Sequence, residues 1–512
     1  MSEWSAGYMA EIDYTYGYYA ELNPARAKLA LLQAGLHAPE VAHACELGFG
    51  QGVSVNIHAA TGGTQWAGTD FNPAHACFAQ ELAQFAGHGA DLQEQAFEAF
   101  CQRSDLPDFD FIGMHGIWSW VSDANRAILV DFLARKLKPG GVLYVSYNTQ
   151  PGWAAMAPMR ELLALHAQTM SAPGAGVLSR VNNALSFAQQ LLDAKPVYAL
   201  LNSGVADRIK TLQTQDRNYL AHEYFNDHWQ PMGFSSMARW LGGAKLQWAC
   251  SAHYIDSLDA INLTAEQSAL LAAIPDVNFR QSVGDFCVNR QFRKDYWVKG
   301  VRELGAAERL QRWRRQGFVL VKLREEIDLE LTGRQARMNC NAALYAPLLE
   351  QLADHEVHTG EQLEQALQPH GIPFDELRHM LWMLCVIDAV HPAQEAGVTE
   401  QARACADRLN ACLLERASDA SAVSCLASPV TGGGVGITPF QQLFLRARQS
   451  GMTQAAEWGQ HAWRTLQALG QCVVKDGEAL RDPAANLAEL QSQAEDFAAR
   501  VLPMLRALRV AP

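Results

Sequence analysis

The residues best suited to chemistry lie in one stretch, residues 45–75. Gly48, Gly50 and Gly52 follow an apolar run and precede a helix-like segment. Glycines at such a turn let the backbone approach a ligand closely, and the N-terminus of the next helix offers free N–H groups. Asp70 closes the following strand-like run, at a distance typical of a carboxylate that accepts hydrogen bonds from ribose hydroxyls. The pattern predicts a site for a nucleoside-containing ligand.

The spacing of the glycines and the residue ahead of them distinguish between ligands. The dinucleotide fingerprint is G-x-G-x-x-G/A, whereas here the third glycine comes one residue early. Glu46 stands directly ahead of the loop, where a carboxylate suits a cationic group such as the amino group of S-adenosylmethionine (SAM) and sits poorly beside a pyrophosphate. We therefore expect SAM as the cofactor, rather than a nicotinamide, a flavin or a purely structural glycine turn.

Two further segments agree with a SAM site. Residues 92–97 lie where the adenine pocket is expected, and Gln95 is placed to bond the adenine amino group, with an exposed glutamine as the alternative. The LKPGG sequence at 137–141 is typical of the corner that precedes the fifth strand in SAM-dependent methyltransferases, although other αβ junctions use it too. The expected cofactor contacts are Glu46, Gly48, Phe49, Gly50, Gly52, Asp70, Phe71, Asn72, Gln95, Ala96, Phe97 and His115.

Methyl transfer from a sulfonium needs mainly proximity, alignment and surroundings that tolerate a moving positive charge. An amine acceptor must be neutral, which an apolar pocket favours, and aromatic faces hold the methylated cation. Tyrosines, tryptophans, a histidine and an asparagine occur near the expected active face, and for each the alternative is ordinary packing. The tyrosines before the first strand are Tyr14, Tyr16, Tyr18 and Tyr19. We expect catalytic roles for His115, Trp118, Tyr16, Tyr18, Tyr147 and Asn148, and substrate contact for Trp120.

Two local motifs narrow the chemistry. His115-Gly116-Ile117-Trp118 departs from the N/D-P-P-Y motif of enzymes that methylate planar amides and adenine, which leaves lysine or a small-molecule oxygen or nitrogen nucleophile. His222-Glu223 is followed by His228 rather than by a histidine at i+4, so the H-E-x-x-H zinc motif is excluded and no metal is expected. We expect residues 219–231 to form a helix over the site. Its candidate substrate contacts are His222, Glu223, Asn226 and His228.

The elements that position these residues alternate between strand-like and helix-like segments. The predicted strands are Ala42–Leu47, Thr64–Asp70, Phe109–Met114 and Gly141–Tyr147, followed after a helical stretch from Glu161 to Leu241 by Leu246–Ile255 and Asp295–Val298. The predicted helices between the early strands are Val53–Ala60, Pro73–Phe85 and Ala124–Leu137. Such alternation implies a parallel sheet covered on both faces. We therefore expect an α/β fold with a Rossmann-like seven-stranded methyltransferase sheet, a helical insertion, and a mainly helical α+β C-terminal region.

The expected domains follow this pattern. They are a SAM-binding core (1–170), a helical regulatory or dimerisation insertion (171–242), the remaining core strands (243–305), a middle domain for which a winged-helix-like fold is one interpretation (306–425), and a C-terminal helical domain (426–512). The glycine-rich run Gly432–Gly436 is interpreted as a flexible loop.

Composition excludes several classes of protein. A hydrophobic fraction of 49% and a charged fraction of 19% are ordinary for a soluble globular chain of 512 residues. The start of the chain lacks a secretory signal, no apolar run is long enough to span a membrane, and the 11 cysteines stand singly. We expect a cytoplasmic protein without membrane insertion. A net charge of −13 argues against a nucleic-acid partner, and the basic stretch Arg290–Arg315 is interpreted as a solvated connector.

Longer motifs give the chain a family resemblance. These motifs are YAELNPARAKLALL (19–32), CELGFGQG (45–52), GTDFNPAH (68–75), DFDFIGMHGIWSWV (108–121), LKPGGVLYVSYNTQPGWAAMAPMREL (137–162), YLAHEYFNDHWQP (219–231) and LASPVTGGGVGI (426–437). Together they resemble the bacterial SAM-dependent methyltransferases with a methyltransferase regulatory domain, including the rickettsial protein lysine methyltransferases. The resemblance implies a SAM-binding core, a dimerisation insertion, a homodimer, and mobile C-terminal domains that help to cover the substrate site. Phe49, Gln95 and Trp118 depart from the usual cysteine, acid and tyrosine of related sequences.

The expected function is methyl transfer from SAM to protein lysine ε-amines. Two alternatives stay open at this point. One is a methyltransferase of a small metabolite or surface polysaccharide, and the other is a regulatory protein that binds SAM without turnover.

Overall fold

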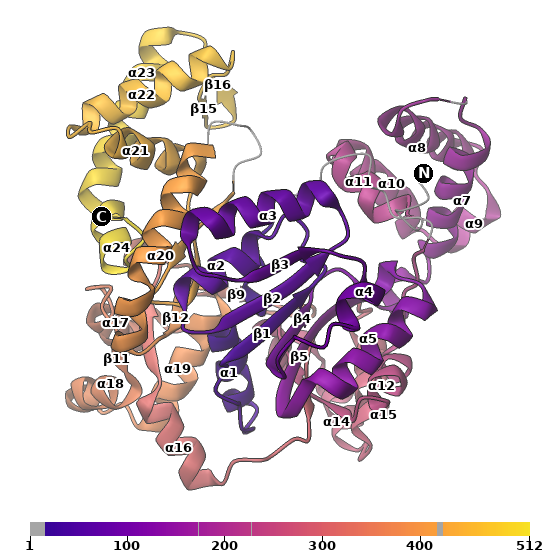
Figure 1. Cartoon of the computed structure of the whole chain (residues 1–512), viewed down its shortest axis with the longest axis horizontal. Coiled ribbons are helices and arrows are strands. Elements are labelled where there is room, and N and C mark those ends of the chain that lie inside the picture. Colours follow the sequence, from indigo (N-terminus) through magenta and orange to yellow (C-terminus); the bar gives the residue numbers. More distant parts are fainter. Residues whose placement is uncertain (1–15, 173, 227, 417–422, 512) are drawn as a thin grey trace.

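Seven strands form one sheet in the computed structural model, which describes residues 16–172, 174–226, 228–416 and 423–511 (Figure 1). Their order is β3-β2-β1-β4-β5-β7-β6, with β7 antiparallel to both neighbours and the pairs from β3 to β5 parallel. The strands are β1 (His43–Leu47), β2 (Gln65–Asp70), β3 (Asp91–Glu94), β4 (Phe109–Met114), β5 (Leu137–Asn148), β6 (Leu246–Ser251) and β7 (Phe292–Lys299). This topology confirms the predicted Rossmann-like seven-stranded sheet.

Helices cover both faces of the sheet because successive side chains on each buried strand point to opposite sides. On β4, Phe111 packs toward one face and Ile112 toward the other, and Tyr144 and Val145 of β5 divide in the same way. The helices on the first face are α1 (Pro24–Gln33), α2 (Val53–Thr61) and α3 (Pro73–Ala86). Those on the second are α4 (Phe97–Cys101), α5 (Asp123–Lys136) and α12 (Phe234–Gly242).

Further helices interrupt the fold twice before the sheet is complete. Between β5 and α12 the helices are α6 (Gln150–Trp153), α7 (Ala157–Thr169), α8 (Val177–Asp193), α9 (Val197–Leu201), α10 (Gly204–Thr214) and α11 (Arg217–Tyr224). They share a hydrophobic core of their own and stand beside the sheet (Figure 1). This confirms the predicted helical insertion. The insertion begins before the expected boundary at residue 171, because α7 belongs to the same hydrophobic core. Between β6 and β7 lie α13 (Asp259–Asn262), α14 (Ala265–Ala272) and α15 (Val277–Cys287).

The C-terminal region is mainly helical with small sheets, as predicted. Its helices are α16 (Ala306–Arg315), α17 (Ala342–Gln351), α18 (Gly360–Leu367), α19 (Phe374–Val386), α20 (Ala396–Glu415), α21 (Pro439–Gln449), α22 (Ala455–Ala468), α23 (Pro483–Asp496), the π-helix Phe497–Val501 and α24 (Leu502–Ala507). Its strands are β8 (Gly317–Leu320), β9 (Glu330–Thr332), β10 (Arg337–Asn339), β11 (His358–Thr359), β12 (Val390–Ala393), β13 (Cys425–Ser428), β14 (Gly433–Gly436), β15 (Val474–Lys475) and β16 (Glu478–Ala479).

The C-terminal region packs directly onto the core, with α20 against α2 and α3 (Figure 1). Two expectations change here. Gly432–Gly436 is not a flexible loop, because Gly433–Gly436 forms β14, pairs with β13 and is largely buried. The expected domain boundary at 425/426 falls inside β13. Within the described ranges, no helix has both the length and the apolar character needed to cross a membrane.

Candidate active site

A cavity of about 330 Å³ opens at the carboxyl edge of the parallel strands. The loops that follow β1, β2, β3 and β4 supply most of its lining, as expected for a ligand site in a fold of this kind. The predicted residues that line it are Glu46, Gly48, Phe49, Gly50, Asp70, Phe71, Gln95, Ala96, Phe97, His115, Trp120 and His228. Tyr19 also lines it.

The glycine loop needs its glycines for both conformation and space. Gly48, Gly50 and Gly52 have φ angles of +74°, +57° and +69°, a region that side chains disfavour. A Cβ on Gly48 would lie 2.3 Å from Cδ1 of Ile117, and a Cβ on Gly52 2.4 Å from Cβ of Ala79. Gly52 therefore supports the loop from behind, as the N-cap of α2, and does not line the cavity.

Asp70 connects the glycine loop to the start of α3. Its Oδ2 accepts a hydrogen bond from the Gly50 amide at 2.9 Å, and its Oδ1 accepts one from the Asn72 amide at 3.0 Å. The Nδ1 of His75 lies 3.3 Å from the same Oδ1. Asn72 caps α3 through the Ala74 amide and lies outside the cavity lining. Oδ2 of Asp70 therefore keeps acceptor capacity for a ligand hydroxyl.

Two acceptor atoms of the cavity lining have no partner among the described residues. They are the buried Oε2 of Glu46 and the buried Oε1 of Gln95. Burial, with a further contribution from the Asp70 carboxylate, raises the pKa of Glu46 well above its usual range. A cationic donor group would relieve this cost at Glu46, and a neutral N–H donor would do so at Gln95. The donor set fits SAM, which carries both kinds of group.

His115 forms an aromatic wall with Tyr19, whose ring stacks on the imidazole with centroids 3.6 Å apart. The Nδ1 of His115 lies 2.8 Å from the Tyr144 hydroxyl. That hydroxyl interacts with the Ser146 side chain, which itself accepts the Gly116 amide at 2.8 Å. Gly116, Ser146, Tyr144 and His115 Nδ1 thus form one continuous chain of hydrogen bonds, which fixes the orientation of the imidazole ring. Burial lowers the pKa of His115 to about 3, so the ring is a neutral donor.

Three predicted catalytic residues at the ends of β4 and β5 do not line the cavity. Trp118 is fully buried, with its Nε1 donating to Met232 Sδ at 3.5 Å. Tyr147 is also fully buried and donates to Asp295 Oδ2 at 3.1 Å. Asn148 accepts from Trp153 Nε1 at 3.1 Å. Neighbouring helices and β7 cover all three side chains, and a catalytic role for them stays a prediction.

The tyrosines before β1 divide between different environments. Tyr16 packs edge-on against Phe78 of α3, with ring centroids 5.1 Å apart. Tyr18 is directed at His58, where its hydroxyl lies 3.3 Å from Nε2. Neither tyrosine lines the cavity, and a catalytic role for them stays a prediction. Tyr14 lies outside the described residues.

The insertion brings only His228 of its predicted contacts to the cavity lining. His222 and Asn226 are buried, and Asn226 Nδ2 donates to the His222 carbonyl at 2.6 Å. Glu223 lies on α11, outside the lining, and burial raises its pKa to about 7. The expected helix over 219–231 ends at Tyr224, and Phe225, Asn226 and His228 lie outside helix and strand. Among the described residues, no cluster of His, Cys, Asp and Glu is arranged to hold a metal ion.

Several lining residues are not among the site residues predicted from the sequence. They are Gly17, Gln51, His75, Glu98, Gly116, Ile117, Val121, Ser122 and Asn125. Ser122 caps α5 by accepting the Asn125 amide at 3.3 Å, so the N-terminus of α5 borders the cavity. Ser122, just before the predicted helix, is the sequence signal that could have identified these residues. A capping residue next to a ligand-binding loop indicates a helix N-terminus that faces the site.

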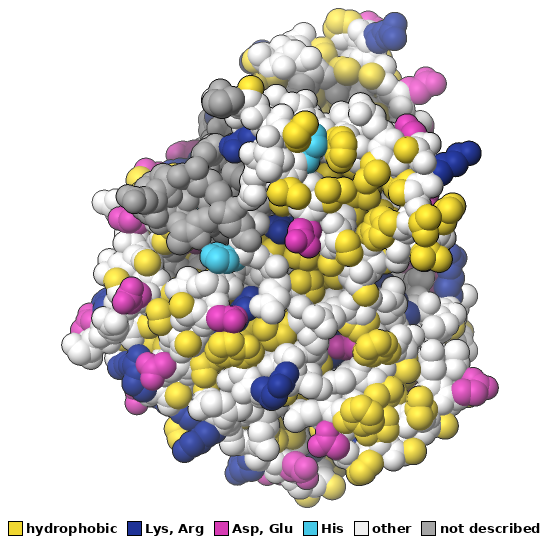
Figure 2. All heavy atoms as spheres, turned by 90° about the vertical axis from the view of Figure 1, so that its right-hand side faces the viewer, with side chains coloured by type: hydrophobic (Ala, Val, Ile, Leu, Met, Phe, Trp, Pro, Cys, Tyr) yellow, Lys and Arg dark blue, Asp and Glu magenta, His cyan; other side chains and the backbone are white. Residues whose placement is uncertain are grey.

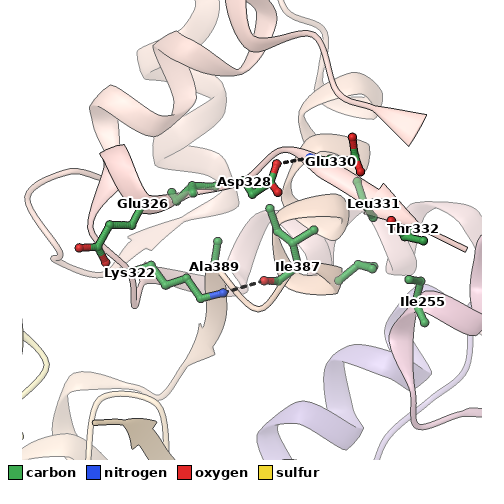
Figure 3. A pocket seen from close by; sticks show the side chains of 11 residues that line it. Ile255, Lys322, Glu326, Asp328, Glu330, Leu331, Thr332, Ile387 and Ala389 are labelled. Atoms are coloured by element: carbon green, nitrogen blue, oxygen red, sulfur yellow. Dashed lines mark hydrogen bonds between the residues drawn. The ribbon is translucent and has the colours of Figure 1, made fainter. Parts of the chain in front are cut away.

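A second cavity of about 300 Å³ lies between the β9 strand and the turn from α19 to β12. Figure 3 shows two hydrogen bonds between residues of this lining. Lys322 Nζ donates to the Ile387 carbonyl at 3.0 Å, and Asp328 Oδ1 accepts the Glu330 amide at 2.9 Å. Among the described residues, no buried polar side-chain atom of this lining lacks a partner, whereas the first cavity has two such acceptors, and we take the first cavity as the active site.

Comparison with known proteins agrees with this site. Residues 45–145 match the family model of a methyltransferase domain, and residues 216–299 match that of a "predicted methyltransferase regulatory domain". An uncharacterized protein of Synechocystis sp. is 36% identical over 512 residues, which cover 99% of each chain. An uncharacterized protein of Rickettsia prowazekii is 25% identical over 295 residues, 55% of this chain and 51% of the relative.

A solved structure shares the fold of nearly the whole chain. PKMT2 from Rickettsia typhi, in complex with AdoHcy, matches with a TM-score of 0.68 and 18% identity over 97% of this chain and 99% of that chain. The domain matches, the sheet order and the near full-length cyanobacterial relative agree with one another. The chain therefore belongs to the class I SAM-dependent methyltransferases that carry a methyltransferase regulatory domain.

Proposed function

We propose that this enzyme transfers the methyl group of SAM to lysine ε-amines of protein substrates. The observation that carries the proposal is the uncharged ring wall of the cavity, where Tyr19 stacks on neutral His115 and Trp120 also lines the space. Such a wall favours a neutral amine by desolvation and holds a methylated cation against ring faces.

Other residues of the lining are suited to holding the donor. Glu46 would pair with the ammonium group of SAM, Gln95 would accept from the adenine amino group, and Asp70 would accept from the ribose hydroxyls. The glycine loop leaves room for close approach of the ligand to its backbone. SAM supplies a methyl group on a positively charged sulfur, which becomes a neutral thioether after transfer.

The chain itself contributes alignment and charge balance. His115 is a neutral ring whose orientation is fixed by the contact of Nδ1 with Tyr144, and its low pKa suits it to orienting a neighbouring group rather than removing a proton. A lysine side chain that packs against this uncharged wall loses its proton to solvent, because desolvation lowers the pKa of the ε-amine. Reaction then depends on alignment of the neutral amine with the methyl group.

The region after β4 supports an amine acceptor. His115-Gly116-Ile117-Trp118 stands where enzymes that methylate planar amides carry N/D-P-P-Y, and Trp118 is buried beneath it. The motifs that resemble those of the rickettsial protein lysine methyltransferases support a lysine acceptor.

The test is incubation of the purified protein with methyl-tritiated SAM and bacterial extract, followed by separation of proteins from small molecules. We expect label in the protein fraction, and its loss when the extract's lysine amines are first acetylated. A Gly48→Val variant, whose added side chain would collide with Ile117, serves as the inactive control. Label confined to small molecules or polysaccharide would favour the other acceptor class, and label that survives acetylation would exclude lysine.

We further propose that the enzyme is a cytoplasmic homodimer that pairs through its helical insertion. Apolar side chains gather on the face of the molecule that carries this insertion (Figure 2). The most exposed large apolar side chains of the insertion are Met170 at 71%, Val197 at 69%, Leu200 at 70% and Leu201 at 79% exposure. Exposed apolar side chains at such density are typical of protein–protein interfaces. The 11 free cysteines support a reducing compartment.

A further inference from the structure

Residues 16–23, the N-terminal strap, run between the donor cavity and the C-terminal region. Gly17 and Tyr19 line the cavity, whereas Tyr18 between them is directed at the β13–β14 hairpin. Successive side chains of an extended chain point to opposite sides, which explains how one segment contacts both. The strap is therefore a direct physical connection between the cavity and the hairpin.

The strap is fixed firmly on its cavity side. The Tyr19 amide donates to Ser54 Oγ of α2 at 2.8 Å while the Tyr19 ring stacks on His115. Leu22 packs against β4 so closely that a Cβ on Gly113 would lie 2.2 Å from its Cδ2. These contacts place the strap backbone against the edge of the sheet from which the active site is built.

The hairpin side depends on the glycines of β14. A Cβ on Gly433 would lie 2.5 Å from the Tyr18 hydroxyl and 2.6 Å from Asn23 Nδ2, and a Cβ on Gly434 would lie 3.0 Å from the Tyr18 ring. The Gly434 backbone hydrogen-bonds to the Tyr18 hydroxyl. Asn23 Nδ2 also donates to the Thr431 carbonyl at 3.2 Å. The glycine run that resembles a loop in the sequence is thus a flat surface that receives the strap.

We infer that Tyr18 is a positioning residue through which the C-terminal hairpin sets the affinity for the methyl donor. The hairpin holds Tyr18, and Tyr18 holds Gly17 and Tyr19 in place as part of the cavity wall. If the hairpin moves away, the strap gains freedom that donor binding must then remove, and affinity falls. Donor binding and docking of the C-terminal region onto the core would therefore favour one another. This inference rests on the proposed donor site.

The test compares two glycines on the same strand. Gly433→Ala adds a methyl group against Tyr18 and Asn23, whereas Gly436→Ala adds one where no heavy atom lies within 4 Å. Calorimetric titration of the full-length protein with S-adenosylhomocysteine should give a Kd raised roughly three- to tenfold for Gly433→Ala, the effect of about one lost hydrogen bond. The Kd of Gly436→Ala should stay within about twofold of wild type. Equal affinity of both variants would overturn the inference.

Tyr18→Phe provides an independent variant that keeps the ring and removes only the hydroxyl bonded to His58 and Gly434. We expect its KM for SAM to rise severalfold with kcat nearly unchanged at saturating SAM. A merely structural role would lower the melting temperature and leave KM unaltered, and that result would contradict the inference even where Gly433→Ala does not fold. Failure of wild type to bind S-adenosylhomocysteine would instead overturn the proposed donor site itself.

Discussion

Replacement of Glu46 by glutamine should weaken donor binding and stabilise the free protein at the same time. The side chain is 2% exposed, and its Oε2 has no partner among the described residues. Burial and Asp70 raise its pKa well above the unfolded value, so the carboxyl group destabilises the fold above about pH 4.3 and not below it. An amide of the same shape avoids that charge. We expect a gain of about 1–3 kcal/mol at pH 8 and little change at pH 4.

The loss in affinity follows from the same contact. A hydrogen bond to a charged group contributes about 1.5–3 kcal/mol, which corresponds to a roughly 10- to 150-fold higher Kd for SAM. Calorimetry measures the Kd, and thermal unfolding at both pH values measures the stability. Glu94→Gln, the same change at an exposed position beside the cavity, is the matched control. The reasoning would be refuted by wild-type affinity in Glu46→Gln, or by a variant less stable than wild type at pH 8.

Four further outcomes are expected. Donor binding should release a proton from Glu46 at neutral pH, so affinity should rise with pH and the calorimetric enthalpy should depend on the buffer's ionisation enthalpy; a buffer-independent enthalpy would contradict this. Asp70→Ala should weaken SAM binding by about 1.5–3 kcal/mol, and unchanged affinity by calorimetry would exclude the ribose contact. Because burial holds the pKa of His115 at about 3, the kcat profile should show no inflection near pH 6.5; an inflection that disappears in His115→Gln would falsify the neutral-donor assignment. Leu200→Asp should yield monomers by light scattering whereas Leu270→Asp, at an equally apolar exposed site outside the insertion, should not.

The parts of the site that sequence predicts best are those set by local backbone geometry. The glycine loop, Glu46 and Asp70 lie where predicted because a turn between a strand and a helix is defined by a few adjacent residues. Strand β3 (Asp91–Glu94) had no predicted bounds, since its short polar sequence DLQE lacks the alternation that marks a half-buried strand.

The parts that sequence reasoning misplaced depend on contacts between distant segments. Trp118 and Tyr18 carry suitable side chains at suitable positions, yet Met232 covers one and the β14 hairpin covers the other. Gly433 lies in a run that the sequence predicts to be a loop, whereas in the structure it belongs to strand β14. A glycine run has low strand propensity, and the space taken by Tyr18 and Asn23 explains why glycine stands at this position of the strand.

The most direct test of the central claim is tandem mass spectrometry of proteins methylated by the purified enzyme with isotopically labelled SAM. The uncharged wall of Tyr19 and His115 and the unpartnered acceptor of Glu46 predict labelled methyl groups on lysine ε-nitrogens, absent with the Gly48→Val variant. Labelled methyl groups on glutamine or carboxylate side chains, or on no protein residue at all, would contradict it.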